Sequence, residues 1–119
     1  MKLIGKTEIV IKKSKFIGYY YEIDDVSLVK GLLETIRKEN KKARHIAYAY
    51  KIGNTAKKSD DKEPANTAGT PIYNIIERKQ LNNVLIVAVR YFGGIKLGSG
   101  GLIRAYSNTA SNLVNEFEQ

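Results

Sequence analysis

Cysteine and tryptophan are absent from this 119-residue chain, which also has one histidine, one methionine and two prolines. Without cysteine the chain forms neither a disulfide nor a thiolate-ligated metal site, and a reducing compartment suits it. No apolar run approaches the roughly 18 residues of a membrane-spanning helix. The first residues lack the apolar centre of a signal peptide. These absences predict a cytoplasmic protein with no membrane partner.

The residues that are present indicate an ordinary globular chain, with 43% hydrophobic and 27% charged residues. At this length we expect a single domain, residues 1–119, with a real apolar core and no second C-terminal domain. Oligomeric state does not follow from the composition.

The net charge of the whole chain is +8, and the positive charge is concentrated in its first half. Residues 1–58 hold 14 Lys or Arg against 6 Asp or Glu, whereas residues 59–119 hold 6 against 6. Such asymmetry favours an anionic partner, with nucleic acid as the first candidate. This positive half includes the closely spaced cations Lys12, Lys13 and Lys15. The alternative is a solvated lysine-rich face that only aids solubility.

Two kinds of periodicity predict the secondary structure. Alternating or β-favouring runs indicate strands, a fully apolar run indicates a central strand, and apolar residues at i, i+3, i+4 and i+7 indicate helices. The expected strands are 7–13, 16–23, 43–52 and 84–89, the last one central; the expected helices follow Asp24 or Asp25, Thr70 and the glycine-rich segment 93–101. The last helix should bury Leu102, Ile103, Tyr106, Ala110, Leu113, Val114 and Phe117.

Five of the ten glycines lie within residues 93–101, in the stretch RYFGGIKLGSGGLIRAY. Neither the Walker pattern nor the dinucleotide pattern is completed there. A glycine-rich turn entering a helix still presents unpaired N–H groups to an anion, and Arg90, Lys96 and Arg104 would add charge. The alternative is close packing of the helix on the sheet. We expect the turn 93–98 to shape an anion site and Gly100 and Gly101 to allow that packing.

The polar segment 53–69 contains a local acidic cluster, Asp60, Asp61 and Glu63. With His45 these residues are candidates for holding a hard cation, or His45 is a candidate general base. The alternative is that the carboxylates meet solvent or nearby lysines and that His45 is an ordinary strand residue. We assign no catalytic residue, metal or cofactor, and we expect residues 54–68 to be mobile or held only by the glycine-rich segment.

Three motifs together resemble the N-terminal domain of the IMPACT/YigZ family: the glycine-rich stretch, SDDKEPANTAGTPI and ARHIAYAY, in that family's order over residues 12–115. The resemblance implies an α+β two-layer sandwich similar to domain 2 of ribosomal protein S5. We expect about four strands, mixed or antiparallel, with the helices on one face. The resemblance also implies a role near the ribosome, because eukaryotic relatives regulate translation under amino-acid starvation. The family commonly has glycine where Lys62 and Asn66 stand.

Two classes of function follow. The first is a non-catalytic, translation-linked protein that binds RNA, the ribosome or a protein of the translation machinery through a basic face and the glycine-rich loop. The second is a protein or enzyme that binds a small molecule or phosphate ligand between residues 59–71 and 90–104. The anion-binding candidates are Lys12, Lys13, Lys15, Arg90, Gly93, Gly94, Lys96, Gly98, Gly100 and Arg104; the ligand-loop candidates are His45, Ser59, Asp60, Asp61, Glu63 and Thr67.

Overall fold

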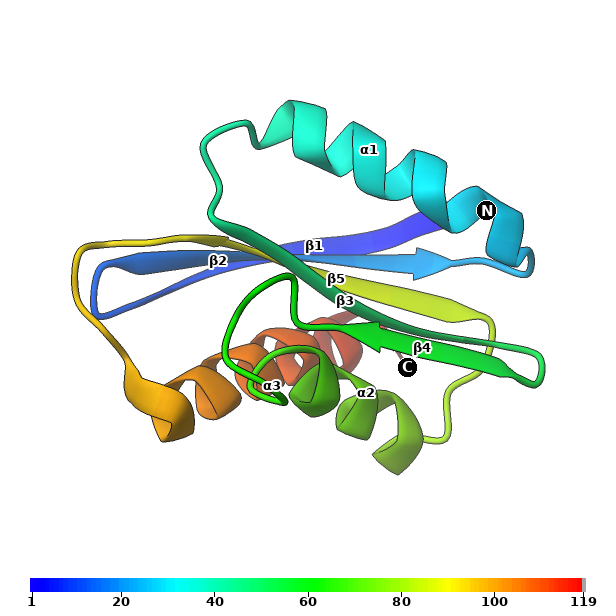
Figure 1. Cartoon of the computed structure of the whole chain (residues 1–119). Coiled ribbons are helices and arrows are strands. Elements are labelled where there is room, and N and C mark those ends of the chain that lie inside the picture. Colours follow the sequence, from blue (N-terminus) through cyan, green and yellow to red (C-terminus); the bar gives the residue numbers. More distant parts are fainter. Residues whose placement is uncertain (119) are drawn as a thin grey trace.

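The computed structural model, which describes residues 1–118, has one five-stranded sheet and three α-helices (Figure 1). Every strand pairs antiparallel with its neighbours, in the order β1-β2-β5-β3-β4. The strands are β1 Lys2–Ile11, β2 Ser14–Glu22, β3 His45–Ile52, β4 Thr55–Ser59 and β5 Val84–Tyr91; the helices are α1 Val29–Glu39, which a 3-10 turn at Val26–Leu28 precedes, α2 Gly69–Arg78 and α3 Gly98–Phe117. The predicted α+β class is confirmed.

Strand β5 lies at the centre of the sheet, as its apolar sequence predicts. It pairs with β2 on one side and β3 on the other, and its residues from Val84 to Arg90 are all buried. The strands expected at 7–13 and 16–23 are β1 and β2, which form an antiparallel hairpin joined through Lys12 and Lys13. Both lysines have positive φ, 47° and 69°, as a tight turn between twisted strands requires.

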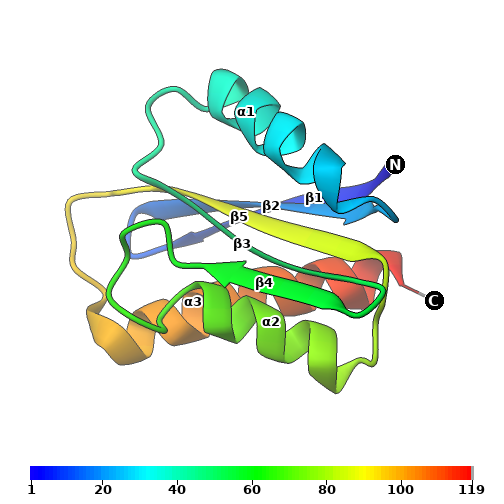
Figure 2. The same cartoon turned by 45° about the vertical axis from the view of Figure 1, so that its right-hand side comes forward.

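Helices cover both faces of the sheet (Figures 1 and 2). Ile86 and Ala88 of β5 belong to the core shared with α2 and α3, whereas Leu85, Val87 and Val89 belong to the core shared with α1. The expectation of helices on one face holds for α2 and α3 and is wrong for α1. The side chains of β5 are apolar on both faces of the sheet. The second face must therefore also be covered by a helix, which removes its apolar side chains from water.

The fifth strand, β4, occupies part of the segment predicted to be a loop. Its sequence TAKKS has no apolar alternation, and four of its five residues are exposed. It forms because the turn at Gly53 and Asn54 folds it back onto β3, where it pairs from Ile52↔Thr55 to Tyr48↔Ser59. Its position comes from pairing, so hydrophobic periodicity does not reveal it.

Helix α3 packs on β1, β2 and β5 through its apolar stripe. Leu102, Tyr106, Leu113 and Val114 are buried as predicted, whereas Ile103 is 43% exposed. The helix approaches the sheet closely at two glycines. An added Cβ would lie 2.2 Å from Phe117 at Gly5, and 2.8 Å from Leu113 and 2.9 Å from Thr109 at Gly18. Within residues 1–118 no helix is long and apolar enough to cross a membrane.

Candidate functional site: a cleft at the cation-rich end

Three connections meet at one end of the molecule: the β1–β2 turn, the α1–β3 connection and the β5–α3 connection (left in Figures 1 and 2). A cleft of about 460 Å³ lies there, between the segment 60–68 and the first turn of α3. It is lined by Arg44, His45, Glu63, Pro64, Arg90, Phe92, Lys96, Leu97, Gly98, Ser99 and Leu102. The structure thus brings residues 63–64 of the acidic loop against the glycine-rich segment.

An ion pair between Glu63 and Arg90 forms the inner wall of this cleft. One guanidinium nitrogen of Arg90 donates to both carboxylate oxygens of Glu63, at 3.0 and 2.9 Å. The two side chains are 3% and 7% exposed, so the pair is removed from water. Two desolvated charges are tolerated only when they neutralise each other and their remaining hydrogen-bonding groups are satisfied.

The remaining groups of this pair find further partners in the core. Ser14 contacts the guanidinium at 3.4 and 3.3 Å, and the hydroxyl of Tyr106 donates a short hydrogen bond to Glu63. Burial, and then the bond to Glu63, raise the pKa of Tyr106 far above its ordinary value, so this hydroxyl keeps its proton. Sequence periodicity marked Tyr106 only as core and did not identify Ser14.

His45 links the acidic loop to this pair. Its Nδ1 lies 2.7 Å from the carbonyl oxygen of Asp61 and its Nε2 lies 3.4 Å from Oε1 of Glu63. A carbonyl oxygen only accepts, so Nδ1 carries a hydrogen in this contact. The imidazole, 18% exposed, therefore presents its Nε2 edge to the carboxylate at the cleft wall. In this arrangement His45 positions the loop, and Glu63 is already engaged by Arg90 and Tyr106.

Asp60 and Asp61 hold the loop to different parts of the fold. Asp60 accepts hydrogen bonds from the backbone N–H groups of Asn66, Ala68 and Gly69, the last two at the start of α2. Burial opposes the charge of Asp60, but these three donors outweigh it and lower the pKa of the carboxyl group. A carboxylate here also complements the positive end of the α2 dipole.

The Asp61 carboxylate points to β3 and α1. It accepts a hydrogen bond from the N–H of Ile46 at 2.6 Å and lies 3.5 Å from Arg37. The expectation that segment 54–68 is mobile or held only by the glycine-rich segment is therefore wrong. Ser59 and Thr67 close local turns, through Asp61 N–H to the Ser59 hydroxyl and the Thr67 hydroxyl to the Pro64 carbonyl. Across the part of the chain described, no three His, Asp or Glu side chains gather as a metal site.

The glycines of segment 93–101 have unequal roles. A Cβ at Gly93 would lie 2.0 Å from the carbonyl oxygen of Lys13, so this glycine allows the β5–α3 connection to pass against the β1–β2 turn. Gly94 and Gly98 have positive φ, 87° and 72°. The expected helix–sheet approach at Gly100 and Gly101 is wrong. A Cβ at Gly100 would meet only Arg104, at 3.4 Å, and a Cβ at Gly101 would meet only Leu97, so no atom of the sheet lies within 4 Å of either.

The predicted cations divide between the cleft and its surroundings. Arg90 and Lys96 line the cleft; the Arg104 guanidinium lies beside Gly100 in the first turn of α3; and Lys12, Lys13 and Lys15 lie at or next to the β1–β2 turn. The ammonium group of Lys15 also lies over the ring of Tyr91, 4.5 Å from the ring centre. We call the set Lys12, Lys13, Lys15, Lys41, Lys42, Arg44, Lys96 and Arg104 the cation-rich end.

An aromatic ring that the sequence prediction missed lies in this cleft. Phe92 is 37% exposed, and the guanidinium groups of Arg44 and Arg90 lie 5.1 and 5.5 Å from its ring centre. The available signal was its position directly after the central strand, because a side chain there lies at the end of the sheet, where the connections meet. Phe92 therefore adds an apolar, cation-binding surface to a cleft already bordered by Lys96.

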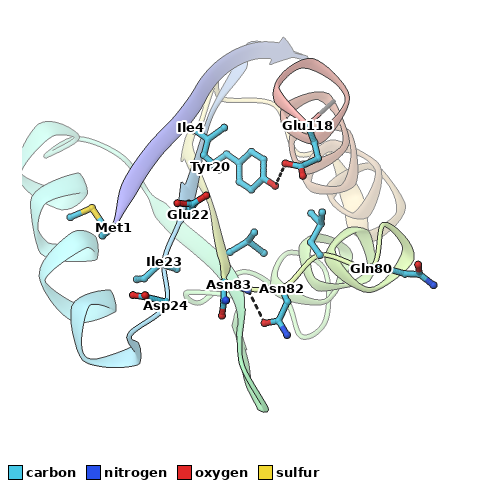
Figure 3. Close-up of a pocket in the computed structure, with 12 residues that line it drawn as sticks. Met1, Ile4, Tyr20, Glu22, Ile23, Asp24, Gln80, Asn82, Asn83 and Glu118 are labelled. Carbon is cyan, nitrogen blue, oxygen red and sulfur yellow. Dashed lines mark hydrogen bonds between the residues drawn. The ribbon is translucent and has the colours of Figure 1, made fainter.

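A second cavity, of about 450 Å³, lies at the opposite end (Figure 3). Its polar groups are amides and carboxylates, among them Asn82, Asn83, Glu22 and Glu118. Tyr20 donates to Glu118 at 2.8 Å, and burial together with this bond raises the pKa of Tyr20 well above its ordinary range. No Lys, Arg or His of residues 1–118 lines this cavity. Its charged side chains are therefore all carboxylates, and it suits an anion less well than the cleft does.

Comparison with known families shows where the chain belongs. The family model of the Impact N-terminal domain matches residues 12–114. The chain belongs to the Impact N-terminal domain family. The resemblance carried by the glycine-rich stretch and the two other motifs is thereby confirmed.

Curated relatives match over most of this chain. IMPACT family member YvyE of Bacillus subtilis is 40% identical over 118 residues, which are 97% of this chain and 54% of the relative. IMPACT family member YigZ of Escherichia coli is 37% identical over 111 residues, 89% and 54% of the two chains. Protein IMPACT homolog of Schizosaccharomyces pombe is 28% identical over 93 residues, 73% and 33%. The chain spans about half the length of the bacterial relatives.

Solved structures share the fold. A crystal structure of a hypothetical protein is 35% identical with a TM-score of 0.90, covering 93% of this chain and 56% of that one. The two-domain translational regulator Yih1 has a TM-score of 0.58 and 21% identity, covering 96% and 46%. The second likeness is one of fold.

Proposed function

We propose that this domain serves in translation regulation by binding RNA or the ribosome at its cation-rich end, with a phosphate group entering the cleft. The observation that carries the proposal is that three separate connections bring cations to one end of the molecule, and two of these connections supply cations to the cleft lining, Arg44 and Lys96. Yih1, which shares the fold, is a translational regulator. The relatives carry the IMPACT name from bacteria to yeast.

The charges in this region suit a polyanion. Lys12, Lys13 and Lys96 are exposed, and none of them makes a salt bridge within the described residues. An exposed cation without a protein partner releases a condensed counterion when it meets a phosphate, which favours binding. Phe92 offers a ring for a base next to this charge. The buried Glu63 is neutralised by Arg90 and so does not repel an incoming phosphate.

The test is a salt titration of binding to a fluorescein-labelled single-stranded RNA and to purified ribosomes. For RNA we expect a log–log slope of about −0.7 per phosphate contacted. The variant K12Q/K13Q/K15Q should flatten the slope and keep its melting temperature. The matched control K2Q/K30Q/K79Q removes the same charge from exposed lysines elsewhere on the fold. Equal slopes for the two variants would contradict the proposal.

A second candidate is a small anionic ligand, such as a nucleotide, held in the cleft alone. The observation that favours it is the enclosure of the cleft by Arg44, Phe92 and Lys96 over the apolar side chains of Leu97 and Leu102. Calorimetric titration with inorganic phosphate and mononucleotides tests this candidate. Lys96→Ala should weaken the binding of a small ligand. The variant K12Q/K13Q/K15Q changes residues outside the cleft lining and should leave the affinity for that ligand unchanged. No heat with any of these ligands would exclude it.

A further inference from the structure

A groove of about 820 Å³ runs between α1 and the β3–β4 edge of the sheet. It lies on the face opposite α2 and α3, and it shares no lining residue with the cleft (Figure 1). Its walls are formed by Val26, Val29, Lys30, Leu33, Glu34, Arg37, Lys38, Tyr48, Tyr50 and Lys57. The groove exists because α1 covers only part of this face, leaving the edge strands uncovered on that side.

The floor of the groove is apolar. Val29 and Tyr50 are buried in the core under α1, and Leu33 and Tyr48 are partly buried against it. Val26 is 39% exposed at one end of the groove. A contiguous hollow of this kind, bordered by polar side chains, marks an interaction surface more often than an isolated exposed side chain does.

The rim of the groove is positively charged on both sides. Lys30, Arg37 and Lys38 come from α1 and Lys57 from β4, against one carboxylate, Glu34. Arg37 lies 3.5 Å from Asp61, but the three lysines form no salt bridge with any residue of 1–118. An occupant with apolar side chains and carboxylates would match both the floor and the rim.

The strand at this edge has an open side. β4 is the last strand of the sheet and pairs only with β3, so its outer backbone groups are available to an added strand. Lys57 lies opposite Tyr50 in the register, which places it on the groove side of β4. Lysines on an edge strand discourage pairing between identical copies, and they favour an acidic strand instead.

We propose that this groove binds an extended segment of a partner protein that combines apolar residues with Asp or Glu. The segment's backbone pairs along β4, its apolar side chains contact Tyr48 and Leu33, and its carboxylates meet Lys38 and Lys57. Single-stranded RNA fits less well, because the floor offers a base only the partly exposed ring of Tyr48. Tyr50 is only 5% exposed, and the other floor residues are aliphatic. This surface is separate from the cation-rich end and does not depend on the function proposed for it.

The experiment is a random-peptide display selection on the full chain, followed by affinity measurements with synthesised winners. Enriched peptides should share apolar residues spaced with Asp or Glu. Their binding should weaken roughly tenfold or more in K38E/K57E. The control K2E/K79E, with the same charge change on exposed lysines away from the groove, should bind as the unmodified chain does. Both variants change exposed lysines, so their melting temperatures should match.

Other outcomes would overturn the proposal. These are a selection with no enriched sequence, winners without acidic residues, or equal binding by the two variants. A labelled RNA that K38E/K57E binds less well than K2E/K79E does, in the absence of peptide binding, would assign the groove to nucleic acid. Concentration-dependent dimerisation that K38E/K57E abolishes, measured by sedimentation equilibrium, would assign it to a second copy of this chain.

Discussion

Glu63 and Arg90 form a buried ion pair although they lie 27 residues apart and belong to a loop and to the central strand. Through this pair the acidic motif and the glycine-rich motif share one wall of the cleft. The position of the acidic loop therefore depends on the buried charge of Arg90.

The first prediction concerns this pair. Glu63→Leu should lower the free energy of unfolding by about 3–5 kcal/mol, because Arg90 is left charged without a partner. The double variant E63L/R90M should lose less than E63L alone, since it removes both desolvated charges together. Urea unfolding measured by circular dichroism gives both values. Additive losses in the double variant would show that the two residues act independently.

The second prediction concerns Asp60 as a remote cap of α2. Asp60→Ala should cost about 0.5–2 kcal/mol, the usual range for a lost helix cap. The pKa of Asp60 is lowered in the fold. Its stabilisation is therefore complete above the unfolded value of about 3.9 and is lost as pH falls through the folded pKa. Thermal melts from pH 7 to pH 2 should show the variant and the parent converging at the acid end. A constant difference across that range would contradict this account.

The third prediction compares two glycines. Gly18→Ala should destabilise the domain and loosen α3, because the new methyl group would overlap Leu113 and Thr109. Gly31→Ala, in α1, has nothing within 4 Å and should stabilise by about 0.5–1 kcal/mol through helix propensity. Thermal denaturation of the two variants should show melting temperatures that move in opposite directions. An unchanged or higher melting temperature for Gly18→Ala would contradict the close approach at Gly18.

The fourth prediction concerns two loop residues with a left-handed backbone conformation. Lys62 and Asn66 have φ of 69° and 64°, the left-handed region, which costs a lysine roughly 1–2 kcal/mol. Lys62→Gly should therefore raise the melting temperature. Lys58→Gly, in extended β4, serves as the control and should lower it. A lower melting temperature for Lys62→Gly would mean that its lysine side chain stabilises the loop by more than the backbone strain costs.

Local pattern was enough for several elements of this protein. The apolar run at 84–89 predicted a central strand, and the pattern in 43–52 predicted a second strand. In the fold this strand carries Ile46 and Tyr50 on one face and Ala47 and Ala49 on the other. The helical stripe of α3 was correct except that Ile103 is exposed and Phe117 is only partly buried. These features follow from periods of 2 and 3.6 residues, which depend only on neighbours in the chain.

Only the tertiary structure decided which partners distant residues meet. The sequence placed Asp60, Asp61 and Glu63 in one acidic cluster, yet the fold separates them toward α2, β3 and Arg90. The fold also determined that α1 covers the second face and that β4 forms at the edge. It determined as well which glycines are in close contact with other segments, namely Gly5, Gly18, Gly69 and Gly93. Composition and hydrophobic periodicity do not predict which segments, far apart in the chain, lie close together in space. Those distances arise when the two apolar faces of β5 are buried at once and the remaining polar groups must find partners.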